Sequence, residues 1–450
     1  MTYKTVKTVV TIGPASESYS TIRKMVAEGV RIFRLNLSHS DLRWHKDIIS
    51  KIRNIERTTK EKLVIILDLP GPKLRIGKLP ADKLEIKQGK VYTLGIKGDI
   101  PISREILNAL SVKENIKLSD GKLELKPIKK NKESIIAKAT NSYTLLSEQS
   151  INQNGLRYPS EYPTKNDVKA IRFGLKNKLN TFALSFISNA KDVEKVRKIA
   201  GKDSVLISKI ERREGVDNFK EIVDASDIVM IARGDLGLNM DISNVPKLQE
   251  KFIVEAHQLR KPVIVATQVL ESMVNSSIPT RAEADDVFTA VEEGTDALML
   301  SEETAIGNYP VRSVKTLIHL IDTFKGEVMR KSDYAIRSED DALAEAAVKL
   351  ADSTDIRNLI IMTIDGASAF RLSRYFDSGI RLFALTPRFE TFKKLTFGRS
   401  IEPFLYKDLN KGMESVKGYL RKKFKTRKSI LVSGAFGKAG STTKIEILDL

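Results

Sequence analysis

The sequence predicts an α/β protein built on a (β/α)8 barrel, with a small domain inserted in the barrel and another domain after it. Eight apolar runs rich in β-branched residues alternate with eight amphipathic patterns up to residue 324. Strands that are apolar on both faces are typical of parallel sheets, and eight such β–α repeats favour a closed TIM barrel. The alternation is interrupted once by a long insertion, and it ends near residue 335.

The elements of the predicted barrel follow one another in regular order. Strands are expected at 8–12, 31–36, 63–68, 181–186, 205–211, 227–235, 262–268 and 297–303. Helices are expected between and after them, at 19–29, 44–56, 166–179, 192–201, 219–226, 245–259, 282–294 and 310–324. We therefore assign residues 1–76 and 161–335 to the barrel domain.

The insertion lies between the third and fourth strands. Residues 77–160 contain short strand patterns separated by turns, at 84–96, 115–128 and 133–140. Such a pattern indicates a small β-barrel domain inserted in a loop at the carboxyl ends of the strands, where barrel active sites form. Residues 336–450 alternate again, with strands expected at 359–366, 381–387, 401–406 and 429–437, and they predict a separate α/β domain.

Composition excludes some classes of function. The chain has 450 residues, no cysteine and a net charge of +19. Disulfides and thiolate metal sites are therefore excluded, and no apolar run is long enough to span a membrane. The basic residues are spread along the chain, so anionic substrates suit the charge as well as nucleic acid does. We expect a soluble cytoplasmic protein with no nucleic-acid or membrane partner.

The strongest functional signal is the set of polar residues at the carboxyl ends of the predicted strands. Burying acids and bases from so many strands is costly without a role. In strand order, the set comprises Thr11 and Pro14; Arg34, Asn36, Ser38 and His39; Asp68, Lys73 and Arg75; Ser185; Lys209 and Glu211; Arg233, Gly234 and Asp235; Thr267, Gln268 and Glu271; and Ser301, Glu302 and Glu303.

These residue types narrow the chemistry. Glu211 and Asp235 follow adjacent strands, and carboxylates without cysteine favour a hard oxygen-ligated ion such as Mg²⁺, with Mn²⁺ as an alternative. Lys209 leaves the same strand face as Glu211, and with Arg34 and Arg75 it offers positive charge to phosphoryl oxygens. Metal carboxylates with a cationic clamp are what phosphoryl transfer needs. A simple salt bridge between Lys209 and Glu211 is the alternative interpretation.

From about Lys4 to Arg330 the sequence resembles the pyruvate kinase family. The matching motifs are TIGPAS (11–16), RLNLSH (34–39), GPKLRIG (71–77), ISKIERREGV (207–216), IARGDLG (231–237), ATQVLESM (266–273), PTRAEADDV (279–287) and LSEETAIGNYP (300–310). The resemblance implies transfer of the phosphoryl group of phosphoenolpyruvate to ADP, a mobile lid at 77–160, a regulatory C-terminal domain and a homotetramer. A phosphorylated effector is possible in the C-terminal domain.

The resemblance also implies a role for each site residue. Lys209 would stabilise the transferring phosphoryl group, Arg34 would hold the substrate phosphate, and Glu211 and Asp235 would bind Mg²⁺. The backbone of Ala232, Arg233, Gly234 and Asp235 and the hydroxyl of Thr267 would hold the carboxylate end of the substrate. A proton would reach the enolate from water on Thr267 or through Ser301. Thr11, Pro14, Asn36, His39 and Arg75 would approach the nucleotide, and Asn36, Ser38 and Asp68 match a monovalent-cation site.

Four positions depart from the family pattern. Relatives carry a glutamate at the position of Lys73 and a threonine at that of Leu69, beside a bound K⁺. We expect the Lys73 ammonium to reach back over Asp68 and replace that ion, so that K⁺ is not required. Asn154 stands where relatives place a lysine near the nucleotide, and Glu302 adds a charge at the mouth.

Two other functions remain open from the sequence. One is a Mg²⁺-dependent lyase or mutase acting on phosphoenolpyruvate or related oxoacids, with the same barrel. The other is a non-catalytic binding protein, against which the intact set of Lys209, Glu211 and Asp235 argues. Asp120, in the turn SDGK, is either a plain turn residue or an acid that swings toward the nucleotide.

Overall fold

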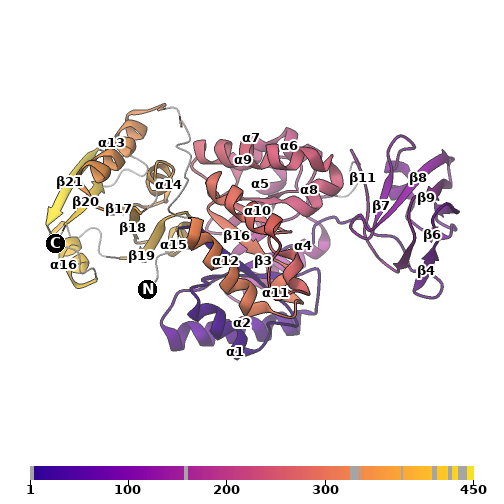
Figure 1. Cartoon of the computed structure of the whole chain (residues 1–450), viewed down its shortest axis with the longest axis horizontal. Helices are drawn as coiled ribbons and strands as arrows, with labels where there is room; N and C mark the ends of the chain where they lie inside the picture. Colours follow the sequence, from indigo (N-terminus) through magenta and orange to yellow (C-terminus); the bar gives the residue numbers. More distant parts are fainter. Residues whose placement is uncertain are drawn as a thin grey trace.

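The computed structural model describes residues 5–156, 161–324, 334, 336–376, 379–407, 413–423, 428–433 and 443–449. Three bodies follow one another along the long axis of the molecule (Figure 1). The barrel lies in the middle, the inserted β domain projects at one end, and the C-terminal domain lies at the other. None of the described helices is long and apolar enough to cross a membrane.

The predicted barrel is confirmed. Its parallel strands close in the order β1-β16-β15-β14-β13-β12-β3-β2. Their bounds are β1 Lys7–Ile12, β2 Ile32–Asn36, β3 Val64–Asp68, β12 Thr181–Leu184, β13 Val205–Ile210, β14 Ile228–Ala232, β15 Val263–Ala266 and β16 Ala297–Leu300. Buried aliphatic side chains fill the interior, and Phe397 from the C-terminal domain joins this cluster.

The outer helices cover the barrel as expected. They are α1 Tyr19–Ala27, α2 Leu42–Thr59, α4 Lys165–Lys176, α5 Ala190–Ala200, α7 Phe219–Ala225, α9 Val245–Gln258, α10 Arg281–Glu292 and α12 Pro310–Phe324. Most begin at a side-chain cap. Thr164 and Thr280 form full capping boxes with Asp167 and Glu283, which satisfy the first backbone amides of α4 and α10. Short helices α6 Arg213–Asp217, α8 Arg233–Asn239 and α11 Glu302–Ala305 follow strand ends near the mouth.

The first three barrel strands end where the sequence pattern predicted, and the other five, β12 to β16, end one to three residues earlier. The run 227–235 is strand only to Ala232, and its last three residues form the first turn of α8. The pairing of β14 with β15 ends at Ala232 opposite Ala266, so the next amides need other partners. The polar residues at these ends therefore lie on loops and helix starts at the rim, which leaves their side chains free to converge.

The inserted domain has its own apolar core. Its elements are β4 Lys83–Ile86, β5 Val91–Gly95, β6 Ile100–Pro101, α3 Arg104–Ala109, β7 Ile116–Leu118, β8 Leu123–Lys130, β9 Ser134–Ala139, β10 Tyr143–Leu146 and β11 Ile151–Gln153. Where we expected a small β-barrel, the described strands form a six-stranded sheet, β11-β7-β8-β9-β5-β6, and the pair β10-β4. A single bridge between Arg75 and Ser150 joins the two chain crossings to the barrel.

The C-terminal domain is an α/β unit, as expected. Its elements are α13 Glu339–Thr354, β17 Asn358–Met362, α14 Ala367–Ser373, β18 Arg381–Thr386, α15 Phe389–Leu395, β19 Ile401–Leu405, α16 Met413–Lys423, β20 Lys428–Ser433 and β21 Lys444–Asp449. The sheet order is β19-β18-β17-β20-β21, and β21 is antiparallel to β20. The sequence pattern missed α13, α15 and β21.

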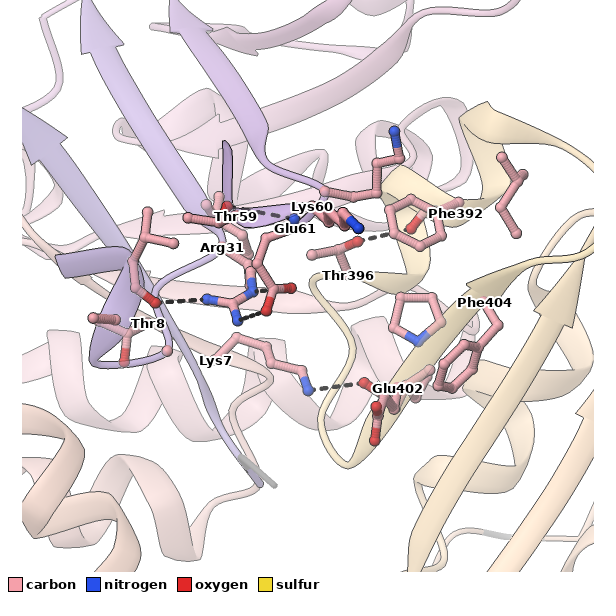
Figure 2. Close-up of a pocket in the computed structure, with 18 of the residues that line it drawn as sticks. Lys7, Thr8, Arg31, Thr59, Lys60, Glu61, Phe392, Thr396, Glu402 and Phe404 are labelled. Carbon is pink, nitrogen blue, oxygen red and sulfur yellow. Dashed lines mark hydrogen bonds and ion pairs between the residues drawn. The ribbon is translucent and has the colours of Figure 1, made fainter. Parts of the chain in front are cut away.

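A cavity of about 600 Å³ separates the amino-terminal ends of the barrel strands from the C-terminal domain (Figure 2). Arg31 and Glu61 form an ion pair of 2.8 Å on its barrel side. Lys7 donates a hydrogen bond of 2.8 Å to the carbonyl of Ile401 across the junction. Burial lowers the pKa of Lys7 to about 8, although Glu402 and Asp296 oppose the shift. The C-terminal domain is thus attached to the floor of the barrel, opposite the strand ends that carry the polar set.

Candidate active site

The polar strand ends meet at the barrel mouth, beneath the inserted domain. A cavity of about 890 Å³ lies there, bounded by the barrel rim and by residues 113–124 and Asn154 of the inserted domain. Asp235, Thr267, Ser301 and Glu302 line its barrel side. The structure therefore brings together residues that are widely separated in the sequence, as the strand-end rule for such barrels predicts.

Lys209 is the centre of a buried cluster of charges. Its ammonium donates to Ser185 Oγ at 2.8 Å and lies 2.8 Å from Glu211 Oε1 and 3.3 Å from Asp68 Oδ1. Burial alone would lower the pKa of Lys209, but the two carboxylates outweigh it, so the pKa lies above its ordinary value. The side chain consequently remains a cation in an environment that excludes most water.

Arg34 and Asp68 form the second part of this cluster. The guanidinium of Arg34 donates to Asp68 Oδ2 through Nε at 2.7 Å, and a second nitrogen lies 2.6 Å from the same oxygen. Burial would raise the pKa of Asp68, but Lys209 and Arg34 together lower it. Asp68 is therefore an ionised carboxylate that orients both cations from the end of β3.

Glu211 and Asp235 fit the ligand set of a hard divalent cation. Glu211 Oε2 accepts a hydrogen bond of 2.6 Å from the amide of Phe186, and Oε1 lies 2.8 Å from the Lys209 ammonium. Burial raises the pKa of Glu211, and nearby Asp235 adds to the shift. Mg²⁺ is usually held in proteins by one or two carboxylates together with substrate oxygens and water.

The segment that follows β14 is anchored to the end of β15. Gly234 donates its amide to Thr267 Oγ1 at 2.7 Å, and Thr267 Oγ1 donates to the carbonyl of Ala266 at 2.6 Å. Thr267 has a φ of 69°, a conformation that β-branched residues rarely adopt. Strain of this kind persists only where surrounding contacts over-determine it, and it is common at functional sites.

The side chain of Arg233 does not face the mouth. It lies 2.7 Å from Asp286 and donates to the carbonyls of Thr267 and Gln268 at 2.9 and 3.0 Å. With these partners the guanidinium is an anchor for α8, so only the backbone of Arg233 remains as a substrate contact. The sequence did not distinguish these two uses of the residue.

Ser301 offers an unpaired hydroxyl at the rim. Its Oγ is buried and has no hydrogen-bond partner among the described residues. Its amide donates to Glu303 Oε2 at 2.6 Å, and Glu303 Oε1 accepts from the amide of Leu270 at 3.0 Å. Burial raises the pKa of Glu303. Glu303 thus fixes the backbone after β16 while the Ser301 hydroxyl remains available to a water or a ligand.

The residues expected near a nucleotide behave differently from one another. Thr11 is buried; its hydroxyl donates to the carbonyl of Leu300 at 2.8 Å and accepts from Arg34 at 3.1 Å, which is a structural use. Arg75 donates to the carbonyl of Glu148 at 2.9 Å, at the crossing to the inserted domain. Burial lowers the pKa of His39, and the cations Arg75, Arg34 and Lys73 lower it further. His39 is therefore neutral at physiological pH.

The structure places Lys73 differently from our expectation. Its ammonium lies 2.9 Å from Asp120 Oδ1 of the inserted domain and 3.9 Å from Asp235 Oδ1, whereas the cations that contact Asp68 are Arg34 and Lys209. Asp68 already pairs with Arg34 and Lys209, whereas Asp120 of the inserted domain is close enough to pair with Lys73. Leu69 is buried and offers no oxygen ligand from its side chain.

The other proposed members of a monovalent-cation site form a local turn. Ser38 donates its amide to Asn36 Oδ1 at 3.1 Å after β2. Sequence reasoning missed Asn239, which donates to the backbone carbonyls of Glu211 and Asp235 at 3.1 and 2.9 Å and so links the backbone of the two candidate metal-binding residues. An asparagine at the end of a short helix carries no recognisable signal in the sequence.

The chain matches two protein-family models and is similar to several known proteins. Residues 3–314 match the family model described as pyruvate kinase, barrel domain, and residues 341–448 match pyruvate kinase, alpha/beta domain. The chain is 33% identical to the pyruvate kinase of Thermotoga maritima over 99% of both chains. It is 33% identical to that of Methylorubrum extorquens, over 98% of this chain and 96% of the relative. It is 38% identical to that of Thermococcus litoralis, over 70% and 69% of the two chains.

Proposed function

The chain belongs to the pyruvate kinase family, and from that premise we propose how its own residues carry out the reaction. The enzyme transfers the phosphoryl group of phosphoenolpyruvate to ADP, giving pyruvate and ATP. The comparisons give no support to the lyase or mutase alternative. The observation that carries the proposal is the buried Lys209 ammonium held between Asp68 and Glu211 at the mouth of the barrel.

In the proposal, Lys209 stabilises the phosphoryl group as it moves between substrates. The charge is fixed in place by Ser185 and two carboxylates before substrate arrives, so little reorganisation is needed when negative charge develops. Arg34, which Asp68 orients, holds the phosphate of phosphoenolpyruvate. Both cations are in the low-dielectric mouth, where their effect on a developing charge exceeds that in water.

We assign the divalent metal to Glu211 and Asp235. The family requires a divalent ion, and we propose Mg²⁺, with Mn²⁺ as an acceptable substitute. When bound, the ion would neutralise charge on the substrate oxygens. The nearness of Asp235, whose charge adds to burial in raising the pKa of Glu211, supports this assignment, because two close carboxylates are stabilised by a shared cation.

The carboxylate end of the substrate is assigned to the backbone of Ala232, Arg233, Gly234 and Asp235 and to Thr267. Thr267 already contacts Gly234 and fixes the segment in position. A water held by Thr267, or a relay through the unpaired Ser301 hydroxyl, would supply the proton that converts the enolate to pyruvate.

We assign the nucleotide to the side of the mouth formed by Pro14, Asn36, His39 and Arg75, with Thr11 acting through Arg34 rather than by direct contact. Residues 77–160 would form the lid that covers it. Closure excludes water and so favours transfer over hydrolysis. Hydrogen exchange in the lid should slow when both substrates are bound, and unchanged exchange would argue against closure.

We also propose that the reaction does not require K⁺. Leu69 provides no side-chain ligand for the ion, and Lys73 places a tethered positive charge at the mouth, 3.9 Å from Asp235. We had predicted that the Lys73 side chain would extend over Asp68. Instead its ammonium lies between Asp120 of the lid and Asp235 of the barrel.

We extend the proposal to the domain division and the assembly of the protein. The domain division is 1–76 with 161–335, 77–160, and 336–450. We propose a cytoplasmic homotetramer whose C-terminal domain can bind a phosphorylated effector. No nucleic-acid or membrane partner is proposed.

A coupled assay for pyruvate tests the function. Phosphoenolpyruvate and a divalent metal should yield pyruvate only when ADP is present, with one ATP formed for each pyruvate. Pyruvate formed at the same rate without ADP would favour a lyase or phosphatase and would overturn the proposal.

A further inference from the structure

The lid contacts the barrel at the far end of the helix that carries Asp235. That helix, α8, is short, and its last carbonyls have no partner within the helix. Lys117, in the middle of β7 of the lid, donates its ammonium to the carbonyl of Leu238 at 3.2 Å and to that of Gly237 at 3.5 Å. A lysine at helix carbonyls satisfies acceptors and also interacts favourably with the negative end of the helix dipole.

A second contact brings the lid against the same turn of α8. Gly121, in the hairpin between β7 and β8, has a φ of +84°, and a Cβ added there would lie 2.7 Å from Leu238 Cδ2. The positive φ favours glycine, and a Cβ there would press on the end of the Leu238 side chain. The lid therefore makes two contacts with the end of α8: a polar one through Lys117 and an apolar one between Gly121 and Leu238.

The end of α8 is hydrogen-bonded to the backbone of both candidate metal-binding residues. Asn239 donates to the carbonyls of Asp235 and Glu211 from the residue next to Leu238. The start of the helix is anchored at Thr267 through Gly234. A displacement of the last turn would thus reach the backbone of both residues through one side chain, and would shift the points from which their carboxylates extend.

We propose that Lys117 is a positioning residue: it braces the end of α8 and couples the position of the lid to the site formed by Glu211 and Asp235. The proposal rests on the proposed function, since it assumes that those two carboxylates serve phosphoenolpyruvate and its metal. It adds that the lid acts on the substrate site through the protein backbone, as well as by covering the nucleotide.

Two lid variants that weaken the contact and three matched controls test the coupling in the full-length enzyme. Lys117→Met removes the donors and keeps most of the side chain, whereas Lys117→Arg retains donors of similar reach. Gly121→Ala pushes the hairpin from Leu238. Gly89→Ala is its control, because Gly89 is also in the lid with a φ of +81° but has no atom within 4 Å of an added Cβ. Lys126→Met removes an exposed lid lysine of β8.

The first measurement is hydrogen exchange of the amides of residues 236–241 without any ligand. Lys117→Met should accelerate exchange about three- to tenfold, the effect expected for losing one or two net hydrogen bonds. Gly121→Ala should act in the same direction. Lys117→Arg, Gly89→Ala and Lys126→Met should remain within about twofold of wild type. Unchanged exchange in both Lys117→Met and Gly121→Ala would overturn the proposal.

The second measurement separates positioning from general damage. Lys117→Met should raise the KM for phosphoenolpyruvate and the half-saturating metal concentration by about three- to tenfold, with smaller changes in kcat and in the KM for ADP. Equal losses in all parameters, or the same losses in Lys126→Met, would contradict a specific role. An inactive wild type would refute the proposed function instead, and the exchange experiment would still decide the contact itself.

Discussion

Each end of the barrel holds a lysine, buried at the mouth and half-buried at the floor, and the two lysines have opposite pKa shifts. At the mouth, Lys209 lies within 3.3 Å of two carboxylates, and its pKa is raised. At the floor, Lys7 donates to a carbonyl of the C-terminal domain, and burial lowers its pKa to about 8. The same residue type is therefore held charged at one end and is close to neutralisation at the other. Only the first arrangement suits a group that must face moving negative charge.

The largest effect on catalysis should come from replacing Lys209 at the mouth of the barrel. Lys209→Met should lower kcat by about 10³ or more, because the charge acts mainly on the transition state. Binding of phosphoenolpyruvate should persist, since Arg34 and the metal carboxylates remain. Lys7→Met is the matched control and should retain most of the wild-type kcat. A Lys209→Met enzyme that retained a tenth of wild-type kcat would remove this lysine from the central role.

The second largest effect should come from substituting the two candidate metal carboxylates. Glu211→Gln and Asp235→Asn each remove a formal charge from a site for a hard ion, and the half-saturating Mg²⁺ concentration should rise about tenfold or more. A metal titration monitored by substrate turnover and by direct Mn²⁺ binding measures this. Unchanged titrations in both variants would place the ion elsewhere.

A smaller effect on the rate is expected from replacing Lys73, whose ammonium contacts Asp120 of the lid. The wild type should run at nearly full rate in a tetraalkylammonium buffer free of K⁺ and Na⁺. Lys73→Glu combined with Leu69→Thr should be slower by about tenfold, the effect of roughly 1.4 kcal/mol on the barrier, and K⁺ should partly restore the rate. A wild type that needs K⁺ for most of its activity would show that Lys73 does not replace the ion.

At the floor, the expected effect is on stability rather than on catalysis. The pKa of Lys7 is about 8 in the folded protein and 10.5 in its ordinary state, so between these values the unfolded chain binds more protons. Stability of the wild type relative to Lys7→Met should therefore rise as pH increases from 8 to 10.5. Urea unfolding of both proteins at pH 7 and pH 10 measures the difference, which should be about 1 to 3 kcal/mol. A difference that does not change with pH would mean that Lys7 keeps its charge.

The contrast between local and long-range features explains what the sequence could predict. Apolar runs locate all eight barrel strands, and the polar residue after each strand identifies Lys209, Glu211 and Asp68, because topology alone brings strand ends together. The exact strand ends were wrong at 227–235, since hydrogen-bond pairing rather than hydrophobicity determines where β14 stops. The structural use of the Arg233 side chain depends on Asp286 and on two carbonyls that no local pattern reveals.

Contacts between domains were the least predictable. The pairing of Lys73 with Asp120 and of Lys117 with α8 depends on where the lid sits above the barrel, and neither the spacing nor the residue types encode that placement. Short elements such as α15 and β21 were missed because their few residues show no clear period. The roles of individual site residues stay predictions until the variants are measured.

The most direct test of the account is the stoichiometry of ATP and pyruvate formed by the wild type, Lys7→Met and Lys209→Met from phosphoenolpyruvate and ADP. The account predicts one ATP for each pyruvate in the wild type and in Lys7→Met, no pyruvate without ADP, and a rate about 10³-fold lower in Lys209→Met. Pyruvate released without ADP, or a Lys209→Met enzyme as active as Lys7→Met, would contradict the claim that the mouth of the barrel transfers the phosphoryl group.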